Sequence, residues 1–144
     1  MMLCHEALRH TRGAVLSLAS FRPATETIDW LGVGNVEGVL IRAPNIESSP
    51  DGQKVSLEQD RFAHESLRLH GGVIGYQIPR LHPSELKIRR GDVIILATDG
   101  LDSGFSRICP GTLGCQALAD EILFKHERLS DDSLVLVARY LGVS

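Results

Sequence analysis

The run VIILATDG, residues 93–100, constrains the structure of this chain more strongly than any other segment. Its apolar residues predict a buried strand, and the strand closes on a carboxylate at Asp99. A second run, DDSLVLVA at residues 131–138, has the reverse order, with Asp131 and Asp132 before an apolar strand. Carboxylates at strand ends that share one sheet edge suit a hard divalent cation such as Mg²⁺ or Mn²⁺. The two runs therefore point to metal-assisted chemistry.

The two acidic motifs meet only if their strands are antiparallel neighbours. The end of one strand and the start of the other then lie at the same sheet edge. Parallel strands of about six residues would place the motifs roughly 20 Å apart. The segment 112–128, predicted to be a helix, must therefore return the chain to the edge that it left. Each motif alone is also typical of an ordinary turn, because Asp-Gly is a common turn dipeptide and two successive aspartates suit a solvated turn.

Size and composition narrow the classes of function. With 144 residues, 43% of them apolar, we expect residues 1–144 to form a single domain with a sizeable core. The net charge is −3 and there is no basic stripe, so nucleic acid is not an expected partner. No apolar run is long enough to span a bilayer, and no signal-peptide core is present at the N-terminus. The three cysteines lack zinc-site spacing, and free thiols in a cytoplasmic protein are the simplest interpretation.

The first half of the sequence predicts one helix followed by a strand meander. The helix and strands are expected at 2–10, 14–21, 25–33 and 36–42. Gly34-Asn35 suits a two-residue hairpin turn between the last two strands, since both residues tolerate positive φ. The segment 43–69 gives a weak signal and begins as a loop. The glycine-rich segment 71–76 lacks the residues of a phosphate-binding loop, and a close-packed turn is the better interpretation.

The second half predicts a turn, the two apolar strands and the helix between them. Gly91-Asp92 is typical of a turn into a buried strand. A loop follows at 100–111, and Thr112 is a candidate cap for the helix that runs to about Arg128. The last strand is expected at 133–141. Because strands cluster in the meander and at the end, the fold class is α+β, a layered sandwich of largely antiparallel sheets flanked by helices.

The order of these motifs resembles a known family, the type 2C metal-dependent Ser/Thr protein phosphatases, and most closely its bacterial SpoIIE/RsbX-like branch. The resemblance covers nearly all of the chain, and the two acidic motifs are its most specific part. Thr98-Asp99-Gly100-Leu101 is similar to the family's "S/T-D-G-L" metal motif, and residues 131–134 resemble its final "D-D/N-x-T" motif. Three further segments also resemble the family and stand in the same order as in the family: 12–18, 32–36 and 72–75.

The resemblance implies a binuclear Mg²⁺ or Mn²⁺ centre with Asp99 and Asp131 as ligands. Gly100, Asp132 and Asp102 are the candidates for residues next to those ligands. In the family, the metals activate a water that attacks the phosphorus of a phosphoserine or phosphothreonine, and no covalent phosphoenzyme is needed. The branch implies a phosphorylated STAS-domain regulator of a bacterial stress or signalling pathway as substrate.

The chain also departs from the family pattern. Leu134 stands where the family has Thr, and the family's first metal motif, which supplies the Asp that bridges both metals, is missing. The chain therefore resembles the C-terminal part of the family's domain, and its domain is expected to be N-terminally incomplete. The lack of the family's first strands would expose a sheet edge, which favours self-association.

Two functions from different classes are consistent with these residues. The first is a metal-dependent protein phosphatase, whose activity as this short chain depends on the missing bridging Asp. The alternative is a non-catalytic phosphatase-like module that binds a protein partner. The arginines Arg12, Arg42 and Arg107 are candidate phosphate contacts, among which the sequence does not choose.

Overall fold

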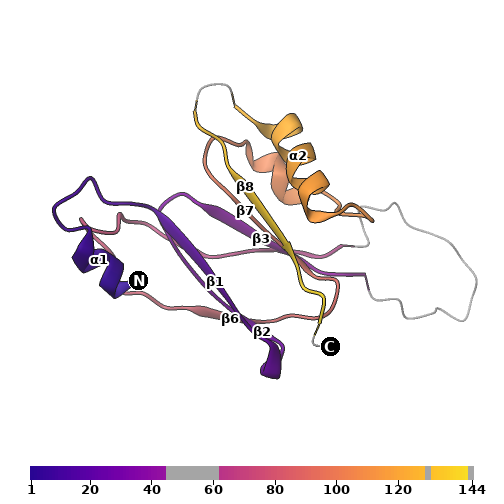
Figure 1. Cartoon of the computed structure of the whole chain (residues 1–144), viewed down its shortest axis with the longest axis horizontal. Helices are drawn as coiled ribbons and strands as arrows, with labels where there is room; N and C mark the ends of the chain where they lie inside the picture. Colours follow the sequence, from indigo (N-terminus) through magenta and orange to yellow (C-terminus); the bar gives the residue numbers. More distant parts are fainter. Residues whose placement is uncertain (45–61, 129–130, 143–144) are drawn as a thin grey trace, which may run out of the picture.

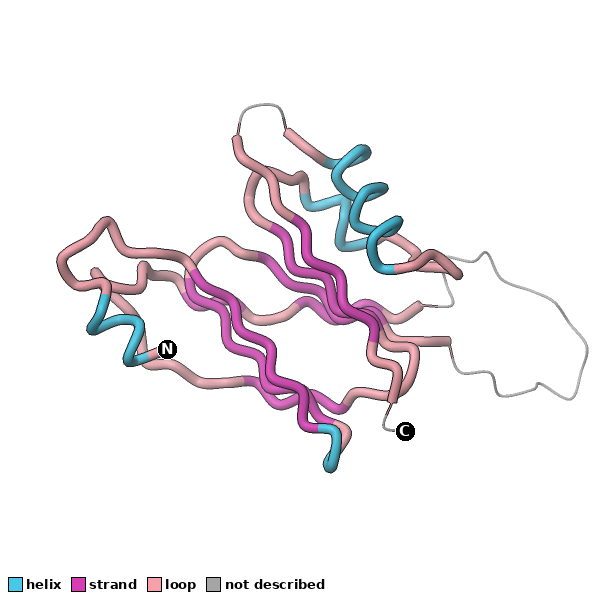
Figure 2. Tube along the Cα trace, in the orientation of Figure 1, coloured by secondary structure: helices cyan, strands magenta, loops and turns pink. Residues whose placement is uncertain are grey.

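The computed structural model describes residues 1–44, 62–128 and 131–142. Within these ranges the chain forms strands, two α-helices and short 3₁₀ turns (Figure 2). In chain order the elements are α1 Met2–Ala7, β1 Leu16–Arg22, η1 Pro23–Thr25, β2 Thr27–Val33, β3 Glu37–Ile41, β4 His64–Ser66, β5 Leu69–His70, β6 Ser84–Lys87, β7 Val93–Ala97, η3 Ser103–Arg107, α2 Cys115–His126 and β8 Val135–Arg139.

The strands form two sheets, with α2 outside the second one (Figure 1). The first sheet has the order β1-β2-β5, with β6 also paired to β2, and the second has the order β4-β3-β7-β8. Every pairing between described strands is antiparallel except that of β2 with β5. The fold class expected from the sequence, an α+β sandwich of largely antiparallel sheets, is therefore confirmed.

Strand β7 contributes to both layers of the core. Its side chains alternate between the two faces of the sheet. Ile95 packs with Leu118 and Ile122 of α2 on one face, and Ile94 packs with Trp30 of the first sheet on the other. All five side chains are at most 2% exposed. Burial of each such side chain contributes about 1.5–3 kcal/mol to stability. Packing on both faces therefore fixes the position of β7 and of the residues that follow it.

The connection between β2 and β3 corrects the predicted hairpin at Gly34-Asn35. Strand β2 pairs with β1, β5 and β6, whereas β3 pairs with β4 and β7, so the two strands belong to different sheets. Gly34 does have a positive φ of 99°, as a tight reversal requires. The reversal carries the chain from one sheet to the other, because a local turn signal does not specify which strands will pair.

Both helices are shorter than the sequence predicts. The helix expected at 112–128 is α2, Cys115–His126, and Gly114 at its N-cap provides no side-chain cap. The prediction that Thr112 caps this helix is therefore wrong. The first helix ends at Ala7 rather than continuing to residue 10. Neither described helix is long and apolar enough to cross a membrane.

The glycine-rich segment 71–76 is a close-packed turn, as expected. The carbonyl of Val73 accepts hydrogen bonds from the backbone N–H groups of Tyr76 and Gln77, at 3.1 and 2.9 Å. Gly75 has a φ of 96°, and a Cβ there would lie 2.6 Å from the carbonyl oxygen of Leu8. Of the preceding segment 43–69, residues 45–61 lie outside the described residues, and β4 with the first residue of β5 occupies its end.

Candidate functional site

The end of β7 and the start of β8 lie at one edge of the second sheet. The two strands pair antiparallel along their whole length, from Val93 opposite Arg139 to Ala97 opposite Val135. The geometric requirement that the sequence placed on the two acidic motifs is therefore met. Residues that follow Ala97 and residues that precede Val135 emerge side by side.

Hydrogen bonds join the two motifs beyond the strands. Thr98 donates its N–H to the carbonyl of Leu134 at 3.1 Å, and its Oγ1 accepts the N–H of Leu134 at 2.9 Å. Ser133 donates its hydroxyl to the carbonyl of Gly100 at 2.9 Å. A Cβ on Gly100 would lie 2.4 Å from the carbonyl oxygen of Asp132, so glycine is required for this close approach. The two acidic turns are thus fixed against each other.

Asp99 is exposed at this edge and is oriented by a residue from the other half of the sequence. Asn35, in the connection between β2 and β3, donates its side-chain N–H to Oδ2 of Asp99. Sequence reasoning placed Asn35 in a hairpin turn and missed this contact. The only available signal was a polar residue that follows a buried strand, which is too common to identify a partner 64 residues away.

Asp131 and Asp132 are also exposed. One carboxylate oxygen of Asp131 accepts the backbone N–H of Asp132 at 2.9 Å, which fixes the side chain at the turn. Within the described ranges, no basic side chain forms an ion pair with Asp99 or Asp131. As far as the described residues go, neither carboxylate is neutralised, and each could bind a cation.

Asp102 has a different role, because its half-exposed carboxylate is bound by other residues of the chain. Its Oδ1 accepts the N–H of Gly104 at 2.7 Å, which caps η3, and contacts Nδ1 of His126 at 3.0 Å. The same two residues are also joined through their backbones, because Asp102 donates its N–H to the carbonyl of His126 at 2.9 Å. The N–H of Gly104 and the imidazole of His126 hold the pKa of Asp102 below its usual range. Asp102 thus anchors the segment after Asp99 to the end of α2.

At this edge of the sheet, Asp99 and Asp131 are the described residues that could hold a hard cation. Mg²⁺ is usually held by one or two carboxylates, with waters and substrate phosphate completing its coordination. Asp99 and Asp131 supply two exposed carboxylates of this kind. Among the residues that the structure describes, no group of three or more His, Cys, Asp or Glu side chains is placed to hold a metal ion. A binuclear centre would therefore need ligands beyond the described residues.

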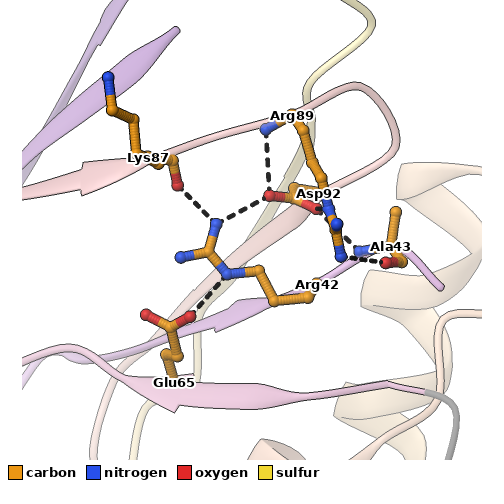
Figure 3. Close-up of polar contacts among 6 residues, drawn as sticks. All are labelled: Arg42, Ala43, Glu65, Lys87, Arg89 and Asp92. Atoms are coloured by element: carbon orange, nitrogen blue, oxygen red, sulfur yellow. Dashed lines mark hydrogen bonds and ion pairs between the residues drawn. The ribbon is translucent and has the colours of Figure 1, made fainter. Parts of the chain in front are cut away.

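Arg42, one of the three candidate phosphate contacts from the sequence, lies at the end of the second sheet opposite the acidic motifs. It follows β3, whose last residue pairs with the first residue of β7. Its guanidinium binds the carboxylate of Glu65 at 2.6 Å, that of Asp92 at 3.0 Å, and the carbonyl of Lys87 (Figure 3). The hydrogen bond with Glu65, followed by that with Asp92, raises the pKa of Arg42, although burial opposes this.

Asp92 is the centre of this second cluster. It is fully buried, and its carboxylate accepts the N–H of Ala43 at 2.8 Å and the N–H of Arg89 at 3.2 Å in addition to the guanidinium of Arg42 (Figure 3). The sequence identified Asp92 only as part of a turn. Its contacts join the end of β3, the turn between β6 and β7, and, through the backbone, Tyr140 after β8.

Comparison with solved structures identifies the architecture. One similar structure is that of "The bacterial stressosome: a modular system that has been adapted to control secondary messenger signaling". The two chains are 25% identical with a TM-score of 0.71, and the match covers 95% of this chain and 64% of that one. This chain is 17% identical to RsbX in complex with magnesium (TM-score 0.66, covering 94% and 60%). It is 14% identical to the phosphatase domain of the cell fate determinant SpoIIE from Bacillus subtilis (TM-score 0.54, covering 90% and 57%).

This chain spans less than two thirds of the length of each of these three structures. No protein-family model matches it, and no curated protein matches it. A further SpoIIE structure contains the PP2C phosphatase domain with part of the regulatory domain, and it covers 94% of this chain at a TM-score of 0.59. The two sheets, the helix outside the second sheet and these likenesses together give the chain the fold of the PP2C-type phosphatase domains.

Proposed function

We propose that this chain carries part of a metal-dependent protein Ser/Thr phosphatase site, with Asp99 and Asp131 as ligands of Mg²⁺ or Mn²⁺. The observation that carries the proposal is the antiparallel pairing of β7 with β8, which brings both exposed carboxylates to one edge. The likeness to RsbX in complex with magnesium and to a SpoIIE phosphatase domain soaked with manganese supports the choice of cation.

The bound metal would supply a water of lowered pKa and positive charge for the phosphoryl oxygens. The chain's own residues position that chemistry. Asn35 holds Oδ2 of Asp99, the N–H of Asp132 holds one oxygen of Asp131, and Gly100 lets the two turns approach closely. Two carboxylates hold a cation weakly. The proposal therefore includes a further carboxylate from outside the described residues, as the family's bridging Asp would be.

The proposed substrate is a phosphorylated bacterial regulatory protein, with a STAS-domain regulator as the first candidate. Support comes from the likeness to the stressosome structure and to the regulatory phosphatase domains. Asp132 and Asp102 stand next to the proposed ligands. The carboxylate of Asp102 is already bound to Gly104 and His126. Asp102 would therefore act indirectly, by fixing the position of the segment that follows Asp99.

One observation favours the second candidate function, a non-catalytic module that binds a protein partner. The described residues do not bring a third metal-binding side chain to the edge. A domain that kept only the scaffold would bind partners through its surface and would hydrolyse nothing.

Turnover separates the two candidates. The 144-residue chain is assayed with Mn²⁺ on an aryl phosphate and on a phosphoserine peptide, beside Asp99→Asn and Asp131→Asn. Asp120→Asn, an exposed carboxylate on α2, is the matched control. Because the proposed site includes a carboxylate from outside the described residues, we expect only slow, Mn²⁺-dependent turnover, which both site variants lose and the control retains. Absence of turnover at every Mn²⁺ concentration, together with Mn²⁺ binding that is unchanged in both site variants, would favour the non-catalytic module.

A further inference from the structure

The β8 strand presents an unpaired edge of the second sheet. Leu134 and Tyr140, on either side of β8, exchange hydrogen bonds with the β7 side: the N–H of Thr98 reaches the carbonyl of Leu134, and the N–H of Tyr140 reaches the carbonyl of Asp92. Backbone N–H and C=O groups of successive residues point to opposite sides of a strand. Because those of Leu134 and Tyr140 point toward β7, those of the odd-numbered residues of β8 point away from it. Val135, Val137 and Arg139 therefore present N–H and C=O groups to a side on which no described strand lies.

The side chains along this edge are apolar and incompletely covered. Leu134 is 60% exposed and Leu136 is 48% exposed. On the other face of the strand, a hollow of about 360 Å³ lies between the start of α2 and β8, lined by Cys115, Gln116, Ala119 and residues 134–137. Strand β8 lies at one end of its sheet, and Figure 1 shows α2 to one side of it. The edge thus has room on both faces for the side chains of another strand.

We propose that β8 pairs with β8 of a second copy of this chain, antiparallel, across a two-fold axis at Val137. In this register Val137 lies opposite Val137 of the second copy, and Val135 lies opposite Arg139. These are the residues whose backbone groups point outward, so each N–H and C=O of the edge finds a partner. A two-fold axis makes the interface self-complementary and closes the assembly at two copies.

The charges at the two ends of β8 select the antiparallel arrangement. Asp131 and Asp132 precede the strand, whereas Arg139 ends it and Arg90 lies beside Gly142 just after it. Antiparallel pairing brings the acidic end of each strand to the basic end of the other. Parallel pairing would place like charges together, which is unfavourable. The same strand is thus its own suitable partner, and the proposal does not depend on the proposed phosphatase function.

The contact is expected to be weak. One strand of five residues with its neighbouring turn buries less than the roughly 800 Å² per partner of a standard interface. We therefore expect a dimer whose population rises with protein concentration. Sedimentation of the 144-residue chain across a range from micromolar to hundreds of micromolar is expected to move from the 15.7 kDa mass of one chain toward twice that mass.

Leu136→Lys tests whether this edge carries the contact. It places two like charges beside the two-fold axis and is expected to keep the chain monomeric. Leu18→Lys on β1, where the leucine is 42% exposed, is the matched control and is expected to dimerise as the parent does. A parent that stays monomeric throughout the range overturns the proposal, and so does a dimer that persists in Leu136→Lys or is lost in Leu18→Lys.

Disulfide trapping tests the register and does not depend on a lysine variant that folds. Residues opposite each other in a hydrogen-bonded pair have Cα atoms about 5.5 Å apart, within disulfide range. Val137→Cys is expected to give a covalent dimer on oxidation, above the background of the three native cysteines in the parent. Leu136→Cys is expected to stay near that background, because Ala138 is its opposite residue. Equal trapping of both variants, or of neither, contradicts the proposed axis.

Discussion

The two ends of the second sheet hold carboxylates in opposite ways. At one end Asp92 is fully buried and bound by Arg42 and the N–H groups of Ala43 and Arg89. At the other end Asp99 and Asp131 are exposed and form no ion pair with a described side chain. A carboxylate that the chain itself neutralises maintains the fold. A carboxylate that the described residues orient but do not neutralise could bind a ligand. The comparison predicts that substitutions at the two ends will separate stability from metal binding.

The largest expected effect is on stability at the buried end. Asp92→Ala leaves Arg42 without its buried partner and leaves backbone N–H groups unpaired, so we expect a loss of about 3–5 kcal/mol in the free energy of unfolding. Urea denaturation measures it, with Asp120→Ala on the surface of α2 as the control. A loss below about 1 kcal/mol would show that the cluster around Asp92 does not hold the sheet.

At the other end, Gly100→Ala tests the close approach of the two acidic turns. The added Cβ would lie 2.4 Å from the carbonyl oxygen of Asp132, and relief of that overlap is expected to cost about 1–3 kcal/mol. Gly71→Ala is the matched control, because nothing lies within 4 Å of a Cβ at that position. Equal stability of the two variants in urea would mean that the turns are not held together as described.

A smaller loss of stability is expected for Glu65, the partly exposed carboxylate of the cluster around Asp92. Glu65 is 44% exposed and binds the same guanidinium as Asp92. Glu65→Gln is expected to lower the free energy of unfolding by only about 0.5–1 kcal/mol, because solvent screens the pair. The difference between Glu65→Gln and Asp92→Ala in the same denaturation series measures how much burial contributes. An equal loss in both variants would contradict that interpretation.

The smallest expected effect is a dependence of the chain's stability on pH, which comes from Asp102. Its pKa is lowered in the folded chain by the N–H of Gly104 and by His126. A lowered folded-state pKa gives stability that is present above the unfolded-state value, near 4, and is lost as the pH falls through the folded-state pKa. The parent is therefore expected to exceed Asp102→Asn in stability at pH 6, and the gap is expected to narrow below about pH 4. A gap that stays constant down to pH 2 would contradict this role for Asp102.

The sequence predicted the parts of the structure that depend on local pattern and chain order. The strands expected at 93–98 and 133–141 are β7 and β8, and the antiparallel pairing that a shared acidic edge required is present. The path from β2 to β3 was not predictable, because the two residues Gly34-Asn35 reverse the chain without specifying which sheet receives it.

Other misses arise from contacts between residues far apart in the chain. The Asn35–Asp99 and Arg42–Asp92 pairs join residues 64 and 50 positions apart, and nothing in the local sequence distinguishes their members from turn or surface residues. Asp92 illustrates this limit. Gly-Asp before a strand is typical of an exposed turn, and only the packing of three strand ends around it makes the carboxylate buried.

The central claim, that Asp99 and Asp131 share a cation at the β7–β8 edge, is tested most directly by Mn²⁺ binding to the purified chain. Calorimetry or electron paramagnetic resonance measures the affinity without any need for turnover. We predict that Asp99→Asn and Asp131→Asn each weaken binding by more than about tenfold, while Asp120→Asn leaves it unchanged. Parent-like Mn²⁺ affinity in both site variants would contradict the claim.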